Sequence, residues 1–270
     1  MICILSLHQL QAQPPPALKQ AEAAFEAGLF PLALYEYNRM AFELLPQVDV
    51  HLHMQIGRCH LAQTNYQTAA AFFDQAYFAT EIDSIKMEAA LYKTRALIAE
   101  QQFALALSEL LSLKHGDLNK QQEWSYHFYR ALCHYQMGQF EDARNEWLFC
   151  TTDSVALEQA FLPAKKFHRP NSTSAMLMSA LLPGSGQLYA GEYREATNSF
   201  LINGFFIFYG IRVASRLSPL DALIGVAPWF QRYHAGGYNK ASLLAYNKML
   251  ENRKAYLSEI FHIIENSPSL

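Results

Sequence analysis

Apolar residues recur at the i, i+3, i+4 and i+7 spacing of amphipathic helices through most of the first half of the chain. Turn-forming segments interrupt this pattern just before four aromatic residues, Phe30, Tyr66, Phe103 and Phe140. These aromatic residues are separated by 36, 37 and 37 positions. Because such even spacing is the signature of an internal repeat, the pattern predicts a series of helix pairs over residues 14–150.

Two further positions recur with the same period. An alanine follows each aromatic residue after three positions: Ala33, Ala69, Ala106 and Ala143. Four positions beyond each alanine lies another large apolar residue: Tyr37, Phe73, Leu110 and Trp147. The spacing places all three positions on one face of the second helix of each pair, so we expect this face to pack against the first helix.

The repeated positions resemble the tetratricopeptide repeat. In that family a small residue of the first helix, a Gly-x-aromatic turn and an alanine of the second helix pack closely; Gly57 stands at the small position of the second copy, and Gly138 precedes Phe140 in the fourth. The resemblance implies an all-α helical-repeat solenoid whose concave face binds an extended peptide or a partner helix. It places four side chains on that face: His51, Arg58, Glu88 and Arg95.

Two segments of the second half, residues 170–191 and 196–211, contain no Asp, Glu, Lys or Arg. Pro183 and Gly184 interrupt the first run, and the second has only 16 residues, whereas a spanning helix needs about 20 apolar residues. We therefore expect residues 173–235 to form a membrane-associated helical hairpin. The pattern favours a re-entrant element over a clean pair of transmembrane helices.

The first uncharged run ends in the motif Leu-Pro-Gly-x-Gly-Gln-x-Tyr-x-Gly, which is formed by Leu182, Pro183, Gly184, Gly186, Gln187, Tyr189 and Gly191. This segment resembles the C-terminal membrane region of a group of bacterial tetratricopeptide-repeat envelope proteins. The resemblance implies a location in the cell envelope and a role connected with envelope or membrane-protein assembly. It implies no particular reaction.

Asn203 is an amide side chain in the second, otherwise apolar run. An unpaired amide in hydrocarbon is costly, so we expect Asn203 to face a partner helix and, with Gly204, to pack on the first apolar helix. Farther along the chain, residues 219–230 predict an interfacial helix, and residues 236–270 predict a separate C-terminal amphipathic helix.

Two segments lie outside the repeats and the hairpin. Residues 1–13 have a short apolar patch followed by Gln-Ala-Gln, which is typical of the end of a secretory signal peptide, so we interpret them as its remnant. Residues 151–172 break the repeat period and contain Pro163 and Pro170, so we expect a linker there.

Composition narrows the possible functions. The net charge of −3 lacks the basic excess of nucleic-acid-binding proteins, so we expect no nucleic-acid partner. Only 17% of the residues are charged and 13% are aromatic, which favours a chain that faces lipid or forms large interfaces. The four cysteines have neither the spacing of a metal site nor that of a disulfide framework.

No motif for catalysis is complete. Gly184-Ser185-Gly186 lacks the further glycine of a dinucleotide-binding fingerprint and the Gly-Lys of a phosphate loop, and Ser185 lacks the flanking glycines of a nucleophile elbow. We therefore expect no catalytic residue, cofactor, metal or small-molecule substrate. A minor alternative is an intramembrane enzyme or transporter subunit that uses His234, Asp221 or Gln187.

The sequence thus predicts a non-enzymatic scaffold. Its helical repeats, on the periplasmic side of a cell envelope, would bind a protein partner, and residues 173–235 would tether it to membrane lipid. The alternative is a soluble all-α binding module in which the apolar half is a buried core or a dimer interface.

Overall fold

The computed structural model describes residues 16–44, 49–113 and 119–267, except the side chains of Pro16 and Lys165. The chain divides into two compact units, one up to Cys150 and one from Thr151 to Ser269. Every regular element in the described ranges is a helix, so the all-α prediction is confirmed. The predicted signal-peptide remnant, residues 1–13, lies outside the described residues.

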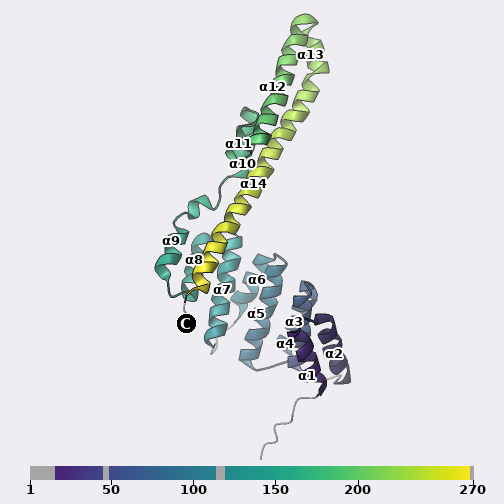
Figure 1. Ribbon diagram of the computed structural model, residues 1–270, viewed down its shortest axis with the longest axis vertical. Coiled ribbons are helices and arrows are strands. Elements are labelled where there is room, and N and C mark those ends of the chain that lie inside the picture. Colours follow the sequence, from purple (N-terminus) through teal and green to yellow (C-terminus); the bar gives the residue numbers. More distant parts are fainter. Residues whose placement is uncertain (1–15, 45–48, 114–118, 268–270) are drawn as a thin grey trace, which may run out of the picture. The chain divides into compact units, whose positions relative to one another are not determined.

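The first unit is a succession of helices. Each helix packs against the next one along the chain, and α5 also packs against α3 and α7 (Figure 1). This arrangement is compatible with a helical-repeat protein. The elements are α1 (Pro16–Glu26), α2 (Phe30–Glu43), α3 (Val50–Ala62), α4 (Tyr66–Phe78), α5 (Asp83–Ala99), α6 (Phe103–Ser112), α7 (Lys120–Gln136), α8 (Phe140–Trp147) and the 3-10 turn η1 (Leu148–Cys150).

The turn inside each helix pair repeats one backbone conformation. In each turn the residue two positions before the aromatic residue has a positive φ angle: 73° at Gly28, 62° at Thr64, 64° at Gln101 and 81° at Gly138. The following N–H donates to the carbonyl five residues earlier, as from Asn65 to His60 at 2.9 Å. This bond closes the end of the first helix in a Schellman motif. Two of the turns thus hold a side chain in the region that favours glycine.

The repeated alanines lie where the two helices of each pair meet. All four have no exposed surface, and the large residues four positions beyond them are at most 1% exposed. Gly57 shows how close the helices are, because a Cβ atom there would lie 2.6 Å from the ring of Phe73. Close approach of the helices therefore depends on small residues opposite large ones.

Replacing Thr64 by glycine should raise the free energy of unfolding by about 1 kcal/mol, because a β-branched residue is strained in the left-handed region. Thr64 is exposed, so the change removes no packing. Urea denaturation measures the effect. In the control Gln63→Gly, one residue earlier at φ −88°, the free energy should fall by about 0.5–1 kcal/mol. A decrease of the same size for both variants would contradict the prediction.

The second unit is also helical. Its longest helix, α14, packs in turn against α9, α10, α11, α12 and α13. In Figure 1, α12, α13 and the first part of α14 form a helical hairpin with α13 at its tip. The elements are α9 (Ser154–Phe161), the 3-10 turn η2 (Ala164–Lys166), α10 (Ser172–Leu181), α11 (Ser185–Tyr189), α12 (Tyr193–Arg216), α13 (Pro219–Gly225) and α14 (Ala227–Glu265).

Two boundaries in this unit differ from the prediction. The segment 151–172 was expected to be a linker, but it holds α9, whose start is capped by Asp153 through the N–H of Ala156 at 2.9 Å. The helices predicted over 219–230 and 236–270 were expected to be separate. Instead α14 continues through Gly236 and Gly237. Glycine costs a helix only about 1 kcal/mol, which packing against α12 offsets.

Large apolar side chains are exposed on both arms and at the tip of the hairpin, so they do not form a buried core within the described chain. They include Phe200, Leu201, Phe205, Phe208, Ile211, Leu217, Leu220, Leu223, Ile224 and Trp229. None of the described helices, however, combines the length with the apolar character that crossing a bilayer requires. In α12 the charged residues Glu195 and Arg212 bound the apolar segment, and in α14 charges recur along the helix. The structure therefore does not bear out a transmembrane helix.

Candidate functional site

Two glycines of the predicted motif lie where α10 and α11 meet, Gly184 in the turn between them and Gly186 in α11. Gly184 has a φ angle of 94°, and a Cβ atom there would lie 2.5 Å from the carbonyl oxygen of Ala196 in α12. A Cβ atom on Gly186 would overlap the carbonyl oxygen of Ala175 in α10. Because no side chain fits in either place, these glycines let α11 lie directly against α10 and α12.

Gln187 joins three helices through its buried amide. Its side chain belongs to a residue that is 1% exposed. The hydroxyl of Ser179 in α10 donates to Oε1 of Gln187 at 2.6 Å, and Nε2 of Gln187 donates to the carbonyl of Gly237 in α14 at 2.9 Å. The N–H of Gly186 donates in turn to the Ser179 hydroxyl at 2.9 Å. Every polar atom of the Gln187 amide group thus serves the packing of the helices, and none is directed at a substrate.

The remaining motif residues end or start helices. Pro183 follows the end of α10, where its missing N–H and the clash of its ring with the preceding helical turn oppose continuation of the helix. The hydroxyl of Tyr189 accepts a hydrogen bond from the N–H of Asn171, the N-cap residue of α10, at 3.2 Å. Gly191, with a φ angle of 84°, forms the turn before α12. The motif therefore specifies the fold of this unit.

Asn203 faces α14 and not the first apolar helix. A Cβ atom on Gly237 would lie 4.0 Å from its Nδ2 atom, while Gly204 has open space around it. Asn203 is 2% exposed, and its Nδ2 donates to the carbonyl of Ser199 at 2.8 Å. Its Oδ1 atom is buried without a hydrogen-bond partner among the described residues. Asn203 therefore lies close to α14, but its amide nitrogen bonds within α12 and no hydrogen bond to a second helix is present among the described residues.

Replacing Gly186 by alanine should lower the free energy of unfolding by about 1–3 kcal/mol, because the new methyl group displaces α10 from α11. The matched control is Gly236→Ala, since a Cβ atom there meets nothing within 4 Å. This control should raise the free energy by about 0.5–1 kcal/mol, as expected for alanine inside a helix. Chemical denaturation followed by circular dichroism compares the two variants. If both variants changed the free energy of unfolding in the same direction, the close contact at Gly186 would not be what excludes a side chain there.

The first unit carries two hollows that include residues of the predicted concave face. One, with a volume of about 340 Å³, includes Glu88 and Arg95; the other, of about 510 Å³, includes Arg58. The first lies on α5 and α7 and is lined by Glu88, Leu91, Tyr92, Arg95, Asn119, Gln121, Gln122, Ser125 and Tyr129. The second lies on the first three helices and is lined by Glu22, Phe25, Glu26, Gly28, Phe30, Tyr37, Gln55, Arg58 and Ala62.

Arg58 stands between the two hollows. Its guanidinium carbon lies 4.8 Å from the ring centroid of Phe25 and 5.8 Å from that of Tyr92. It donates to Oε1 of Gln55 at 3.0 Å, and Nε2 of Gln55 lies 3.4 Å from the ring of His51. The described residues provide no carboxylate partner for Arg58. Stacked aromatic rings therefore hold a cation in place between two polar hollows.

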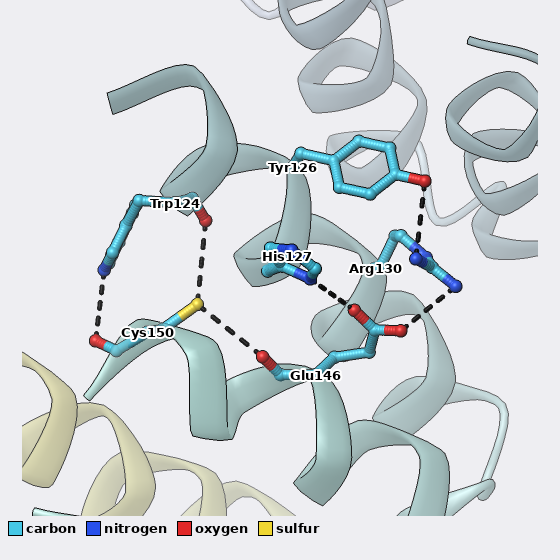
Figure 2. A network of polar contacts seen from close by, with 6 residues as sticks. All are labelled: Trp124, Tyr126, His127, Arg130, Glu146 and Cys150. Atoms are coloured by element: carbon cyan, nitrogen blue, oxygen red, sulfur yellow. Dashed lines mark hydrogen bonds and ion pairs between the residues drawn. The ribbon is translucent and has the colours of Figure 1, made fainter. Parts of the chain in front are cut away.

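A polar network joins α7 to α8 and η1 (Figure 2). The two carboxylate oxygens of Glu146 lie 2.7 Å from Nδ1 of His127 and 3.0 Å from the guanidinium of Arg130. The indole N–H of Trp124 donates to the carbonyl of Cys150 at 3.1 Å. These contacts connect the first helix of the last pair to the second, so the network fastens the end of the first unit.

The described cysteines lack the properties of nucleophiles. Burial raises the pKa of the Cys150 thiol to about 12, and that thiol donates to the carbonyl of Trp124 at 3.6 Å. Burial likewise raises the pKa of Cys59 to about 11 and that of Cys133 to about 12. A reactive cysteine needs the opposite shift, toward the thiolate. No cluster of metal-binding side chains is present in the described part of the chain.

The residues of the minor enzymatic alternative have separate structural partners. His234 donates through Nε2 to the carbonyl of Ala180 at 3.1 Å, and Asp221 accepts from the hydroxyl of Ser218 at 2.6 Å. Gln187 bonds within the helix junction described above. The structure therefore does not assemble these three side chains through shared contacts.

The sequence did not predict the hydrogen bonds of Gln187 to Ser179 and Gly237, or the position of Arg232 in a cavity beside them. The local signal for the contact with α14 was the Gly236-Gly237 pair in an otherwise helical pattern. Glycine within a helix often marks a place where another element packs closely. Arg232 carries no comparable signal because single arginines are common on helices.

Comparison of the chain with models of protein families, with curated protein sequences and with solved structures finds no match.

Proposed function

We propose that this protein is a non-enzymatic scaffold that associates with a membrane through its second unit and binds a protein partner through its first. The repeated positions of the first unit and the Leu-Pro-Gly-x-Gly-Gln-x-Tyr-x-Gly motif of the second favour a tetratricopeptide-repeat protein of a bacterial envelope. In this proposal the repeats lie on the periplasmic side, and the protein serves envelope or membrane-protein assembly.

The exposed apolar surface of the hairpin is the observation that carries the proposal. Soluble monomers rarely expose large continuous apolar patches. Here Leu217 is 74% exposed, Ile224 is 69% exposed and Ile211 is 66% exposed. Covering apolar surface yields about 25 cal/mol per Å². Removal of these side chains from water therefore favours association of the hairpin with an apolar environment. Lipid is the environment that fits apolar side chains distributed around the arms and tip of a hairpin.

The hairpin inserts into one side of the bilayer in this proposal. The uncharged segment of α12 has 16 residues, which corresponds to about 24 Å of helix and falls short of the roughly 30 Å hydrocarbon core. Arg212 and Arg216 both follow the C-terminal end of this segment, and such side chains can extend to the lipid headgroups while their methylene groups stay in apolar surroundings. Trp229 favours the same interfacial level.

The hollows of the first unit support the binding half of the proposal. Each combines aromatic surface with charged side chains, and Arg58 between them lacks a carboxylate partner among the described residues. Arg95 is exposed in the first hollow and has no ion pair in the described chain either. Such a surface recognises an extended peptide through backbone hydrogen bonds and an acidic side chain.

Flotation of the full chain with lipid vesicles tests the membrane half. We expect the protein to float. The triple variant Leu220→Ser, Leu223→Ser and Ile224→Ser in α13 should bind at least about a thousandfold more weakly, since each removed side chain forfeits roughly 1.5–3 kcal/mol of burial. The matched control replaces three exposed leucines of the first unit by serine, Leu29, Leu105 and Leu111. It should float like the unchanged chain.

Failure to float would overturn the membrane proposal. A monodisperse dimer in the absence of detergent would favour the alternative in which the apolar half forms a dimer interface. Sedimentation of the same preparations without vesicles decides between these outcomes.

Site-specific photo-crosslinking in native membranes tests the binding half. A crosslinker at Gln121, in the first hollow, should give a discrete product that the substitution Arg95→Glu abolishes, because the reversed charge repels an acidic ligand. A crosslinker at Asn145, exposed on α8, is the control and should give none. Equal products from both positions would show that the hollow is not the binding surface.

A further inference from the structure

A cavity with a volume of about 460 Å³ lies between α12 and α14 in the second unit. Gly236 and Gly237 on α14 leave the space open, since a Cβ atom on Gly236 would meet nothing within 4 Å. The other arm contributes a row of polar side chains spaced one turn apart. The residues on which the argument depends are Glu195, Ser199, Asn203, Arg232, Gly236 and Lys240.

The cavity carries a net positive charge. Glu195 and Lys240 neutralise each other through an ion pair of 2.6 Å. Arg232 also lines the cavity, and no described carboxylate pairs with it. Arg232 is exposed, so water hydrates it outside a membrane; in contact with lipid an unpaired arginine is costly unless an anion or water neutralises it. The cavity therefore favours an anionic group near Arg232.

Two polar atoms of the cavity-lining residues have no hydrogen-bond partner in the described chain. They are the hydroxyl oxygen of Ser199 and the Oδ1 atom of Asn203, a residue that is 2% exposed. A buried amide oxygen without a donor destabilises the fold. A ligand that brought an N–H or O–H group to this wall would satisfy these atoms with a small rotation of either side chain.

We propose that this cavity binds a phospholipid headgroup in which a phosphate stands next to a hydrogen-bond donor. This inference rests on the proposed function, because it assumes that the hairpin is in contact with lipid. The phosphate pairs with Arg232, and the ammonium group of phosphatidylethanolamine or a hydroxyl group of phosphatidylglycerol donates to Ser199 and Asn203. Phosphatidylcholine does not fit, because its quaternary ammonium has no N–H group.

The experiment measures the affinity of the full chain for three kinds of vesicle. One kind is phosphatidylcholine alone, and the other two contain half phosphatidylethanolamine or half phosphatidylglycerol. Both mixtures should bind more tightly than phosphatidylcholine: about tenfold for phosphatidylethanolamine, whose ammonium group forms a charge-assisted hydrogen bond, and about fivefold for phosphatidylglycerol, whose hydroxyl group forms a neutral one. Gly236→Leu fills the cavity without a change of charge and should abolish this preference. Gly204→Leu is its matched control, because Gly204 is an exposed helical glycine of α12 outside the cavity.

A second pair of variants separates the cavity from diffuse attraction to charged lipid. Arg232→Gln should weaken binding to both mixtures, whereas Arg212→Gln, an exposed arginine of α12 that does not line the cavity, should leave the phosphatidylethanolamine preference intact. Equal losses of vesicle affinity in Arg232→Gln and Arg212→Gln would overturn the proposal. So would equal binding to all three kinds of vesicle.

A soluble phosphate compound is the other source of the same chemistry. Addition of inorganic phosphate at millimolar concentration should not raise the Tm of the chain without vesicles. If it does, and Gly236→Leu removes the increase, the ligand is a soluble phosphate and the headgroup proposal is wrong. Failure to bind any vesicle would refute the membrane association itself. Binding without headgroup preference would refute only this inference.

Discussion

The hydrogen bonds of one buried amide hold the second unit together. Gln187 accepts from Ser179 in α10 and donates to the carbonyl of Gly237 in α14, so three helices depend on a single side chain. It reaches both partners only because Gly186, the preceding residue, has no Cβ atom to keep α11 away from α10. A shorter or apolar side chain would leave the Ser179 hydroxyl without its acceptor in a buried place, which costs more than the bond itself contributes.

Beyond this junction and the buried alanine cluster of α10, α11 and α14, the hairpin buries few large apolar side chains. α12 and α14 extend from the junction as two arms, and their contact is narrow, so most of their apolar side chains remain exposed. A helix that is apolar on nearly all sides is stable only when something else covers it. The polar residues of the hairpin are the exception, because Ser199 and Asn203 turn inward toward the glycines of α14. Most large apolar residues of the arms thus face outward, while Ser199 and Asn203 face inward beside a few apolar contacts such as the stacking of Phe206 on Tyr233.

The first unit has a buried apolar core between the helices of each pair. Its alanines and large residues alternate across each helix pair and bury one another completely. Its surface carries two hollows and a cation held between aromatic rings, besides exposed apolar side chains such as Phe42 and Phe78. In the proposed function these hollows bind the protein partner, and the hairpin of the second unit contacts lipid.

Patterns local to the sequence were sufficient for the all-α fold, for the start of a helix at each repeated aromatic residue and for the apolar character of the hairpin. All of these follow from periodicity over a few turns of helix. The left-handed turn at Thr64, the contact of Gln187 with a residue 50 positions away and the inward orientation of Asn203 toward α14 came only from the tertiary structure. They depend on the register between helices, and register is decided by the packing of side chains far apart in the chain, which no local pattern encodes.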